Sequence, residues 1–375
     1  MTPLADDPTV VQRLLDHLDR KTTDLGDAVW REPVAHYRSE ARFAAERTRV
    51  LRRHPTPFCP SAALPEPGSY VARTAAGTPL VAVRGDDGRV RVFRNACRHR
   101  GTPLADDGAG CERALVCRYH GWTYELDGAL RHVPDRHGFP GLDERAMGLV
   151  PVAAVEREGL VFVTQDAPGA EPGDLPTLIP SRFRLLGFGE IDVPANWKVV
   201  VEGFLEGYHI RSTHPGTFFP LQFDNVNVVE RFGPNSRVAF PFRAIDKLRA
   251  VSPAERSADG KLTYVYHLFP NVMVATFPAR IFVVMLEPLA VDRTRFATYL
   301  LSDRAADDAP AQAYLAQAGA LVERGGAEDR EVACAIQRGL ASGANEVFTF
   351  GLFEAAIVHF HRTLHALIDG PGAPA

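Results

Sequence analysis

The sequence predicts an α+β protein in which an all-β module precedes an antiparallel sheet that packs on long helices. Short apolar runs separated by Gly, Asp and Pro clusters fill residues 56–166, as expected of β-strands and turns. A second series of strand-like runs with short connections lies between Val226 and Leu301, which favours an antiparallel sheet. Helical periodicity returns near the C-terminal end, over residues 309–324, 328–340 and 346–368.

These patterns divide the chain into three parts. Apolar residues recur at helical spacing from Val10 to about Arg53, so we expect residues 1–55 to form an N-terminal helical arm. Residues 56–166 form the all-β module, and the Pro- and Gly-rich stretch 166–180 is typical of a linker. Residues 180–375 form the second domain, which opens with one helical segment from Trp197 to about Arg211.

Composition excludes several classes of function. The 375 residues carry a formal net charge of -4, so no basic surface indicates a nucleic-acid partner. The first residues lack the order of a secretory signal, and the longest apolar run, Ile281 to Leu286, is far shorter than the ~20 residues of a membrane span. We therefore expect a cytoplasmic protein. Five cysteines, an odd number, do not indicate a disulfide framework.

Two Cys–His pairs stand in the all-β module. Cys97 and His99 belong to CRHRG, and Cys117 and His120 belong to CRYHGW, each near a Gly that permits a tight loop. A Rieske [2Fe–2S] centre needs two thiolates on one iron and two imidazoles on the other. A zinc site uses the same ligand types but usually groups Cys with Cys and His with His. The mixed pairs favour the iron–sulfur cluster, with no ligand role for Cys111.

A second group of metal-ligand residues follows Trp197. On a helix turning ~100° per residue, Glu202, Glu206 and His209 would fall within about 60° of one another. Pro215 disfavours helical geometry at His214, so the chain can leave the helix and bring His214 beside His209. Two imidazoles and one carboxylate form the facial triad of non-haem Fe(II) oxygenases, which leaves positions open for O2 and substrate. Glu206 is the nearest carboxylate, although it could instead orient His209.

Asp329 is the better candidate for the third ligand. Three apolar residues follow it at helical spacing, namely Val332, Ala333 and Ile336. This spacing predicts that Asp329 lies on the inward face, while Glu328 and Glu331 point elsewhere. A charge on a buried face is costly unless it is paired or binds a metal. Taken alone, Asp329 would more often be a helix N-terminal acid that the helix dipole stabilises, but the histidine pair reverses this preference in favour of the metal.

The roles of two further residues stay open. Glu202 either orients a metal ligand or belongs to a buried polar network, and Asn196 is either a helix N-cap or a functional amide. The nine remaining histidines, including His359 and His361, we interpret as structural or solvent-exposed.

With these motifs in place, the chain resembles the α-subunits of Rieske non-haem iron oxygenases, the ring-hydroxylating oxygenase superfamily. The resemblance covers nearly the whole chain and rests on CRHRG, CRYHGW, NWK followed by ExxxExYHxxxxH, and ED separated by seven residues from QRGL. It implies a Rieske domain followed by a helix-grip (START/SRPBCC-like) catalytic domain. It also implies a homotrimer in which the cluster of one subunit faces the mononuclear iron of its neighbour.

The resemblance also implies a role for each site residue. Cys97 and Cys117 would bind one cluster iron, and His99 and His120 the other. His209, His214 and Asp329 would hold a mononuclear non-haem Fe(II). Glu206 would be the electron-transfer bridge between His209 and the cluster histidine His120 across the subunit boundary. Ring-dihydroxylating members commonly have Asp at that position, so Glu206, the short chain and the QRGL block lean toward the branch of choline, carnitine and glycine-betaine oxygenases.

The expected function is that of the terminal component of a multicomponent mono- or dioxygenase. It would use O2 to hydroxylate or oxidatively demethylate a small organic substrate, either a quaternary ammonium or an aromatic compound. Because the chain shows no flavin or nicotinamide motif, an NAD(P)H-dependent reductase would supply the electrons, directly or through a ferredoxin. The alternatives are a Rieske-type electron-transfer or sensing protein without oxygenase activity, and a structural zinc protein.

Overall fold

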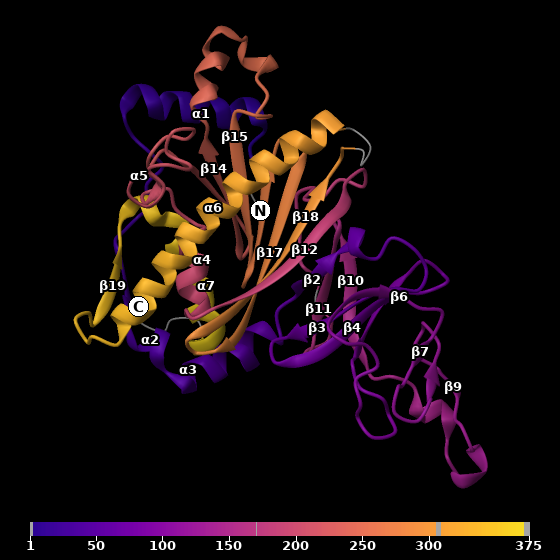
Figure 1. Ribbon diagram of the computed structural model, residues 1–375. Helices are drawn as coiled ribbons and strands as arrows, with labels where there is room; N and C mark the ends of the chain where they lie inside the picture. The colour runs from indigo at the N-terminus through magenta and orange to yellow at the C-terminus, as the bar shows by residue number, and fades with distance from the viewer. Residues whose placement is uncertain (1–2, 170, 305–308, 371–375) are drawn as a thin grey trace. The chain divides into compact units, whose positions relative to one another are not determined.

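The computed structural model describes residues 3–169, 171–304 and 309–370, which divide into two compact units (Figure 1). The smaller unit comprises Leu51–Pro172 and Thr177–Arg184. The larger unit comprises the described residues up to Val50, Gly173–Pro176, and those from Leu185 onward. Among the described helices, none combines the length and the hydropathy that a membrane span requires.

The smaller unit is all-β, as the sequence predicts. Its seven-stranded antiparallel sheet has the order β2-β11-β10-β5-β4-β3-β6, and a three-stranded sheet has the order β7-β8-β9. The strands are β2 (Thr56–Pro60), β3 (Ser69–Ala75), β4 (Thr78–Arg84), β5 (Val90–Arg94), β6 (Gly108–Cys111), β7 (Leu115–Val116), β8 (Thr123–Tyr124), β9 (Leu130–His132), β10 (Pro151–Arg157) and β11 (Leu160–Thr164). Cys97, Cys117, Trp122 and Tyr124 share one hydrophobic core, so the Cys–His loops are anchored by packing.

The larger unit is built on a seven-stranded sheet of order β12-β18-β17-β16-β15-β14-β13, in which the pairings from β13 to β18 are antiparallel. Its strands are β12 (Arg184–Val193), β13 (Val228–Phe232), β14 (Asn235–Pro241), β15 (Leu262–Leu268), β16 (Val272–Phe277), β17 (Arg280–Ala290) and β18 (Arg293–Ser302). The expected α+β fold, with an antiparallel sheet and C-terminal helices, is therefore confirmed.

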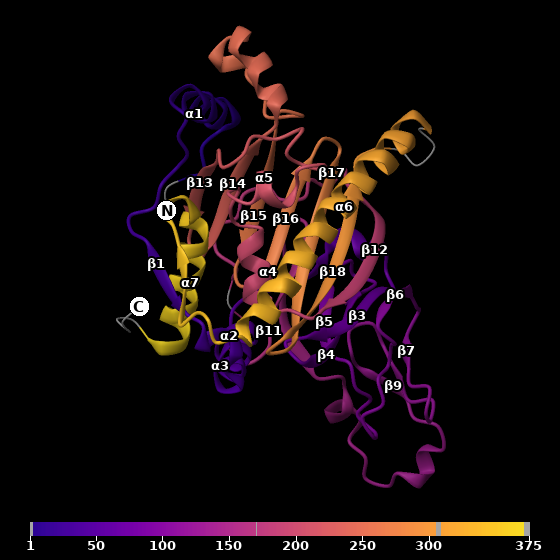
Figure 2. The same ribbon diagram turned by 60° about the vertical axis from the view of Figure 1, so that its left-hand side comes forward.

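Helices cover one face of this sheet. The α-helices are α1 (Asp7–Arg20), α2 (Ala35–Arg38), α3 (Glu40–Ala45), α4 (Trp197–Gly203), α5 (Ile210–Thr213), α6 (Ala309–Leu340) and α7 (Ala355–Asp369). Shorter helical turns occupy Glu46–Leu51, Ser61–Ala63, Arg136–Gly138, Glu144–Met147, Arg243–Ala250, Pro253–Glu255 and Leu352–Glu354. Helix α6 crosses the sheet diagonally, and α4 and α7 lie over the same face (Figures 1 and 2).

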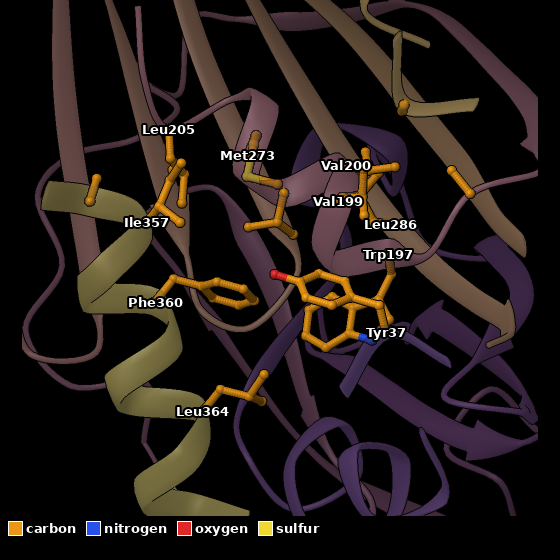
Figure 3. Packing of buried hydrophobic residues seen from close by; sticks show 14 of the residues in the cluster. Tyr37, Trp197, Val199, Val200, Leu205, Met273, Leu286, Ile357, Phe360 and Leu364 are labelled. Atoms are coloured by element: carbon orange, nitrogen blue, oxygen red, sulfur yellow. The ribbon is translucent and has the colours of Figure 1, made fainter. Parts of the chain in front are cut away.

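The core of the larger unit lies between this sheet and the helices (Figure 3). Trp197 from α4 and Phe360 from α7 meet edge to face, with ring centroids 5.6 Å apart. The indole of Trp197 donates to Glu46 at 2.9 Å, and the buried Lys198 ammonium lies 2.6 Å from the other oxygen of Glu46. These contacts hold the start of α4 against the N-terminal segment. They therefore fix the position of α4, from which the segment with the candidate ligands continues.

Four predicted helical segments differ in part from the structure. Trp30–Pro33 is not helical but forms β1, which pairs with β19 (Val347–Phe350) at the start of the last predicted helix. Val347, Phe348, Thr349 and Phe350 are β-branched or aromatic, the types that favour strands. The helices predicted over residues 309–324 and 328–340 form the single α6. A Cβ on Gly325 would lie 2.2 Å from the ring of Phe218, so this glycine permits close packing rather than ending a helix.

Candidate functional site

Two loops of the smaller unit hold the Cys–His pairs with the same backbone hydrogen bonds. The amides of Cys97 and Cys117 each donate at 2.8 Å to the carbonyl five residues further along. Gly101 and Gly121 each donate at 2.9 Å back to the carbonyl of the cysteine. Both glycines have positive φ, 79° and 72°, where side chains are strained. Each loop sequence therefore dictates the same tight turn.

The four candidate cluster ligands lie together. Cys97 and Cys117 are buried free thiols whose side chains interact, and the rings of His99 and His120 have centroids 4.7 Å apart. Nδ1 of His99 is buried without a hydrogen-bond partner, whereas His120 is exposed. Two thiols beside two imidazoles, one of them with an unpartnered ring nitrogen, fit a [2Fe–2S] cluster with unlike ligands on its two irons.

Sequence reasoning missed two aromatic residues beside this site. The hydroxyl of Tyr124 lies 3.3 Å from Sγ of Cys97 and accepts a hydrogen bond from the amide of Arg98 at 2.9 Å. Trp122 stacks on the ring of His99, with centroids 5.0 Å apart and an interplanar angle of 8°. Hydrogen bonds to ligand sulfur tune the potential of an iron–sulfur cluster. The CRYHGW motif contains Trp122, but only the tertiary fold brings Tyr124 to the sulfur.

The second group of ligand residues begins where α4 ends. The predicted continuous helix from Trp197 to Arg211 is wrong, because α4 stops at Gly203 and α5 starts at Ile210. The side chain of Glu206 accepts hydrogen bonds from the amides of Tyr208 and His209. Glu206 thus caps a new turn, as carboxylates do at helix starts, and it does not share a helix face with Glu202.

Glu206 also contacts the ring of the first histidine. Its Oε1 bonds to Nδ1 of His209, and Nε2 of His209 faces Oδ1 of Asp329 at 3.5 Å. Burial by itself lowers the pKa of His209, but hydrogen bonds with Asp329 and Glu206 outweigh it and raise the pKa to about 10.

His214 lies beside His209, where the proline argument expects it. It follows the last residue of α5, and the two ring centroids are 5.2 Å apart. Nδ1 of His214 lies 2.7 Å from Oε2 of Glu328, which also accepts from the hydroxyl of Thr217 at 2.5 Å. The expectation that Glu328 points away from the site is wrong, because the turn after α5 brings His214 against the side of α6 that carries Glu328.

Asp329 completes a group whose ligand atoms fit one metal ion. One nitrogen each from His209 and His214 and one oxygen of Asp329 lie within 4.8 Å of one another. Nε2 of His214 is 2.9 Å from Oδ1 of Asp329, yet it makes no hydrogen bond. Because Nδ1 of each ring already bonds to a carboxylate, a neutral ring turns the lone pair of Nε2 toward Asp329. The lone pair and the carboxylate oxygen of Asp329 then repel each other. A cation between these atoms removes the repulsion, so the group fits a 2-His-1-carboxylate metal site.

The apolar stripe expected to bury Asp329 is partly wrong. Val332 and Ile336 are 41% and 37% exposed, whereas Ala333 is buried. Helix α6 is therefore rotated relative to the expectation, with Ala333 rather than Val332 facing the core. Asp329 consequently lies at the border between core and solvent, with 34% of its side chain exposed. Solvent therefore reaches Asp329 and His209, whereas His214 is fully buried.

The structure also places the two residues whose roles were open. Asn196 is the N-cap of α4: its side chain accepts from the amide of Lys198 at 2.9 Å and donates to the carbonyls of Tyr37 and Val291. Glu202 is buried, and its Oε1 accepts from the hydroxyl of Tyr37 at 2.6 Å and lies 2.9 Å from Nε2 of His361. Glu202 thus belongs to a buried polar network.

Glu354 is a further carboxylate near Glu206, and the sequence patterns did not indicate it. Burial raises the pKa of Glu354 to about 7, and the carboxylates of Glu206 and Glu202 add to this rise. Glu354 caps the turn at Gly351, to whose amide it bonds at 2.5 Å. Only the return of the chain after β19 brings this residue toward Glu206, which is why no local pattern indicates it.

Comparison with known families agrees with this geometry. Residues 54–147 match the family described as Rieske [2Fe-2S] domain. Residues 184–370 match the family described as ring hydroxylating alpha subunit, catalytic domain. The two matches contain all four candidate cluster ligands and all three candidate iron ligands, respectively.

Individual relatives extend the comparison. The carnitine monooxygenase oxygenase subunit of Acinetobacter baumannii is 29% identical over 208 residues, which are 53% of this chain and 56% of that protein. The match thus spans little more than half the length of that relative. The corresponding subunit of Escherichia coli is 27% identical over 365 residues, 89% of this chain and 93% of that protein.

A solved structure shares the fold over the full length. The quaternary ammonium Rieske monooxygenase CntA in complex with L-carnitine has a TM-score of 0.74 and 21% sequence identity, with 99% of each chain covered. At this identity, the likeness concerns the fold.

Proposed function

Because this chain belongs to the α-subunits of Rieske non-haem iron oxygenases, we propose that it is a terminal oxygenase that oxidises a small quaternary ammonium compound with O2. The arrangement of His209, His214 and Asp329 carries the proposal. Both rings direct Nε2 at one carboxylate oxygen, at 3.5 and 2.9 Å, and solvent reaches the carboxylate. An electron carrier without oxygenase activity has no need of this second group.

Each cofactor has its residues. Cys97, Cys117, His99 and His120 would hold the [2Fe–2S] cluster. His209, His214 and Asp329 would hold the mononuclear iron, which when bound supplies the capacity to activate O2. Glu206 and Glu328 keep a proton on Nδ1 of the two histidines and so leave both Nε2 atoms free for the metal.

Electrons would reach the site from outside the chain. The exposed ring of His120 is available to a partner surface, and Glu206 binds the ring of His209 from the side opposite to Asp329. We propose a homotrimer in which Glu206 bridges His209 to His120 of a neighbouring copy. An NAD(P)H-dependent reductase, directly or through a ferredoxin, would reduce the cluster.

The quaternary ammonium substrate rests on two observations. The relatives reported above are named for carnitine or quaternary ammonium oxidation, and one of them matches along most of its length. Glu206 stands where ring-dihydroxylating members of the resembled family commonly have Asp. The family description names ring hydroxylation, so an aromatic substrate is the second candidate.

A single-turnover experiment tests the proposal without the unknown reductase. The iron-loaded protein is reduced with dithionite, freed of reductant, mixed with carnitine, glycine betaine, choline or an aromatic acid, and exposed to O2. We expect product from at least one quaternary ammonium compound, and none from a His214→Ala variant that retains its Rieske EPR signal. No product from any substrate at about three iron atoms per chain would leave only the electron carrier.

A further inference from the structure

The larger unit contains a further group of metal-ligand residues, apart from His209, His214 and Asp329. Glu32 on β1 and His361 and His365 on α7 are buried, and one ligand atom from each lies within 4.8 Å of the others. Among the described residues, this is the second of two such groups, and it shares no residue with His209, His214 and Asp329. The two histidines are four residues apart on one helix, a spacing that places two imidazoles on one face as in many zinc sites.

The hydrogen bonds of His361 show which atom faces Glu32. Its Nε2 lies 2.9 Å from Oε1 of Glu202, which can only accept, so Nε2 carries a proton. In a neutral ring, Nδ1 then bears a lone pair. This Nδ1 is buried, lies 3.4 Å from Oε2 of Glu32, and has no hydrogen-bond partner. Two electron-rich atoms that face each other away from water repel, and either a proton or a metal ion between them removes the repulsion. Nε2 of His214 shows the same pattern against Asp329.

The ring of His365 also lies between two carboxylates. Its Nε2 lies 3.0 and 3.1 Å from the two oxygens of Glu32, and its Nδ1 faces Asp369 at 3.8 Å. Each histidine thus has the central carboxylate on one side and an outer carboxylate on the other. Outer carboxylates of this kind orient the imidazole ligands of metal ions.

The outer carboxylate of His361, Glu202, is itself held by a tyrosine. In Figure 3 the hydroxyl of Tyr37, which donates to Glu202, points toward α7.

The charges around the group favour a divalent ion. Three carboxylates contact the two rings, and Arg42 neutralises one of them through a two-pronged contact with Asp369 at 2.9 and 2.7 Å. With neutral rings, Glu32 and Glu202 leave two negative charges in a buried place. Glu32 also accepts from the indole of Trp30 at 2.9 Å and bonds to Nδ1 of His36 at 2.7 Å. His36 is 26% exposed, so the group is not sealed from solvent.

We propose that Glu32, His361 and His365 form a second metal site, of the zinc class, apart from the catalytic iron. Two imidazole nitrogens and one carboxylate suit a tetrahedral zinc ion, with water in the fourth position. Such an ion would tie β1 to α7 and, through Glu202, to the helix that leads into the Glu206 segment. The inference does not depend on the proposed function.

Zinc titration of the full-length protein, with its Rieske cluster in place, tests this site. A His214→Ala background removes the catalytic metal group and leaves Glu32, His361 and His365 intact. After gel filtration, we expect one zinc per chain by mass spectrometry in this background. The added His361→Gln and His365→Gln substitutions should abolish the zinc, and Glu202→Gln should weaken its affinity by about 10–100-fold.

His359→Gln is the matched control. It lies on the same helix but bonds to the carbonyl of Gly233 at 3.1 Å, and it should leave the zinc content unchanged. Absence of zinc in the His214→Ala background would overturn the proposal, because the group would then be a network of protonated imidazoles. Zinc that persists in the His361→Gln, His365→Gln double variant would overturn it as well. If the double variant does not fold, the titration in the His214→Ala background decides alone.

Discussion

Removing the Glu328 carboxylate should weaken metal binding at a site that Glu328 does not itself contact. The carboxylate lies 2.7 Å from Nδ1 of His214, and it orients the ring whose Nε2 faces Asp329. Loss of such an outer carboxylate weakens metal affinity by about 10–100-fold, or roughly 1.4–2.7 kcal/mol. Since 33% of the Glu328 side chain is exposed, water screens part of its charge.

The Glu328→Gln and Glu328→Ala substitutions should weaken metal binding to different extents. Gln at 328 keeps an oxygen that can accept from Nδ1 and loses only the charge, so we expect a loss near the tenfold end. Ala leaves the ring without a partner, so its loss should approach a hundredfold.

The assay is an anaerobic Fe(II) titration against a chelating indicator, with the Rieske visible spectrum as a check of folding. Glu331→Gln is the control, because Glu331 is exposed on the same helix. Affinities of both 328 variants within about twofold of the wild type would refute the reasoning, and so would an equal loss in the control.

Three further predictions concern the rest of the molecule. Glu46→Gln leaves the Lys198 ammonium buried without its counter-ion. It should therefore lower the free energy of unfolding, measured in urea titrations, by about 3–5 kcal/mol. The Glu46→Gln, Lys198→Met double variant should recover that stability, because it leaves no buried charge. Burial lowers the pKa of His267 to about 4, so between that value and its unfolded pKa the unfolded state binds more protons. Stability should therefore fall as the pH drops from 7.5 to 5, by about 2 kcal/mol more in the wild type than in His267→Phe. Cys117→Ser should abolish the Rieske EPR signal while Fe(II) still binds at the catalytic site; loss of both would mean that the two metal groups are not independent.

Much of the site was predictable because its information is local. The Cys–His pairs sit in loops whose glycines specify the turn, and Pro215 dictates the exit that brings His214 beside His209. Short apolar runs likewise predicted the strands from β13 to β18 and several strands of the smaller unit. These features depend on a few neighbouring residues and on backbone sterics.

The missed features depend on contacts between distant segments. Glu328, Tyr124 and the Glu32 group acquire their partners only through tertiary folding, since the partners lie far away in the sequence. The false helix through Glu206 has a different cause. Its spacing satisfies helical periodicity, but the Glu206 side chain bonds to the backbone amides that follow and starts a separate turn.

The pairing of β1 with β19 has a consequence for synthesis on the ribosome. The segment that contains β1 is translated before the smaller unit, whereas its partner strand and α7 are translated well after it. The smaller unit, which is nearly continuous in sequence, can fold while the ribosome is still working. The larger unit cannot complete its fold until β19 and α7 have emerged, so its early segments stay exposed to chaperones that hold nascent chains.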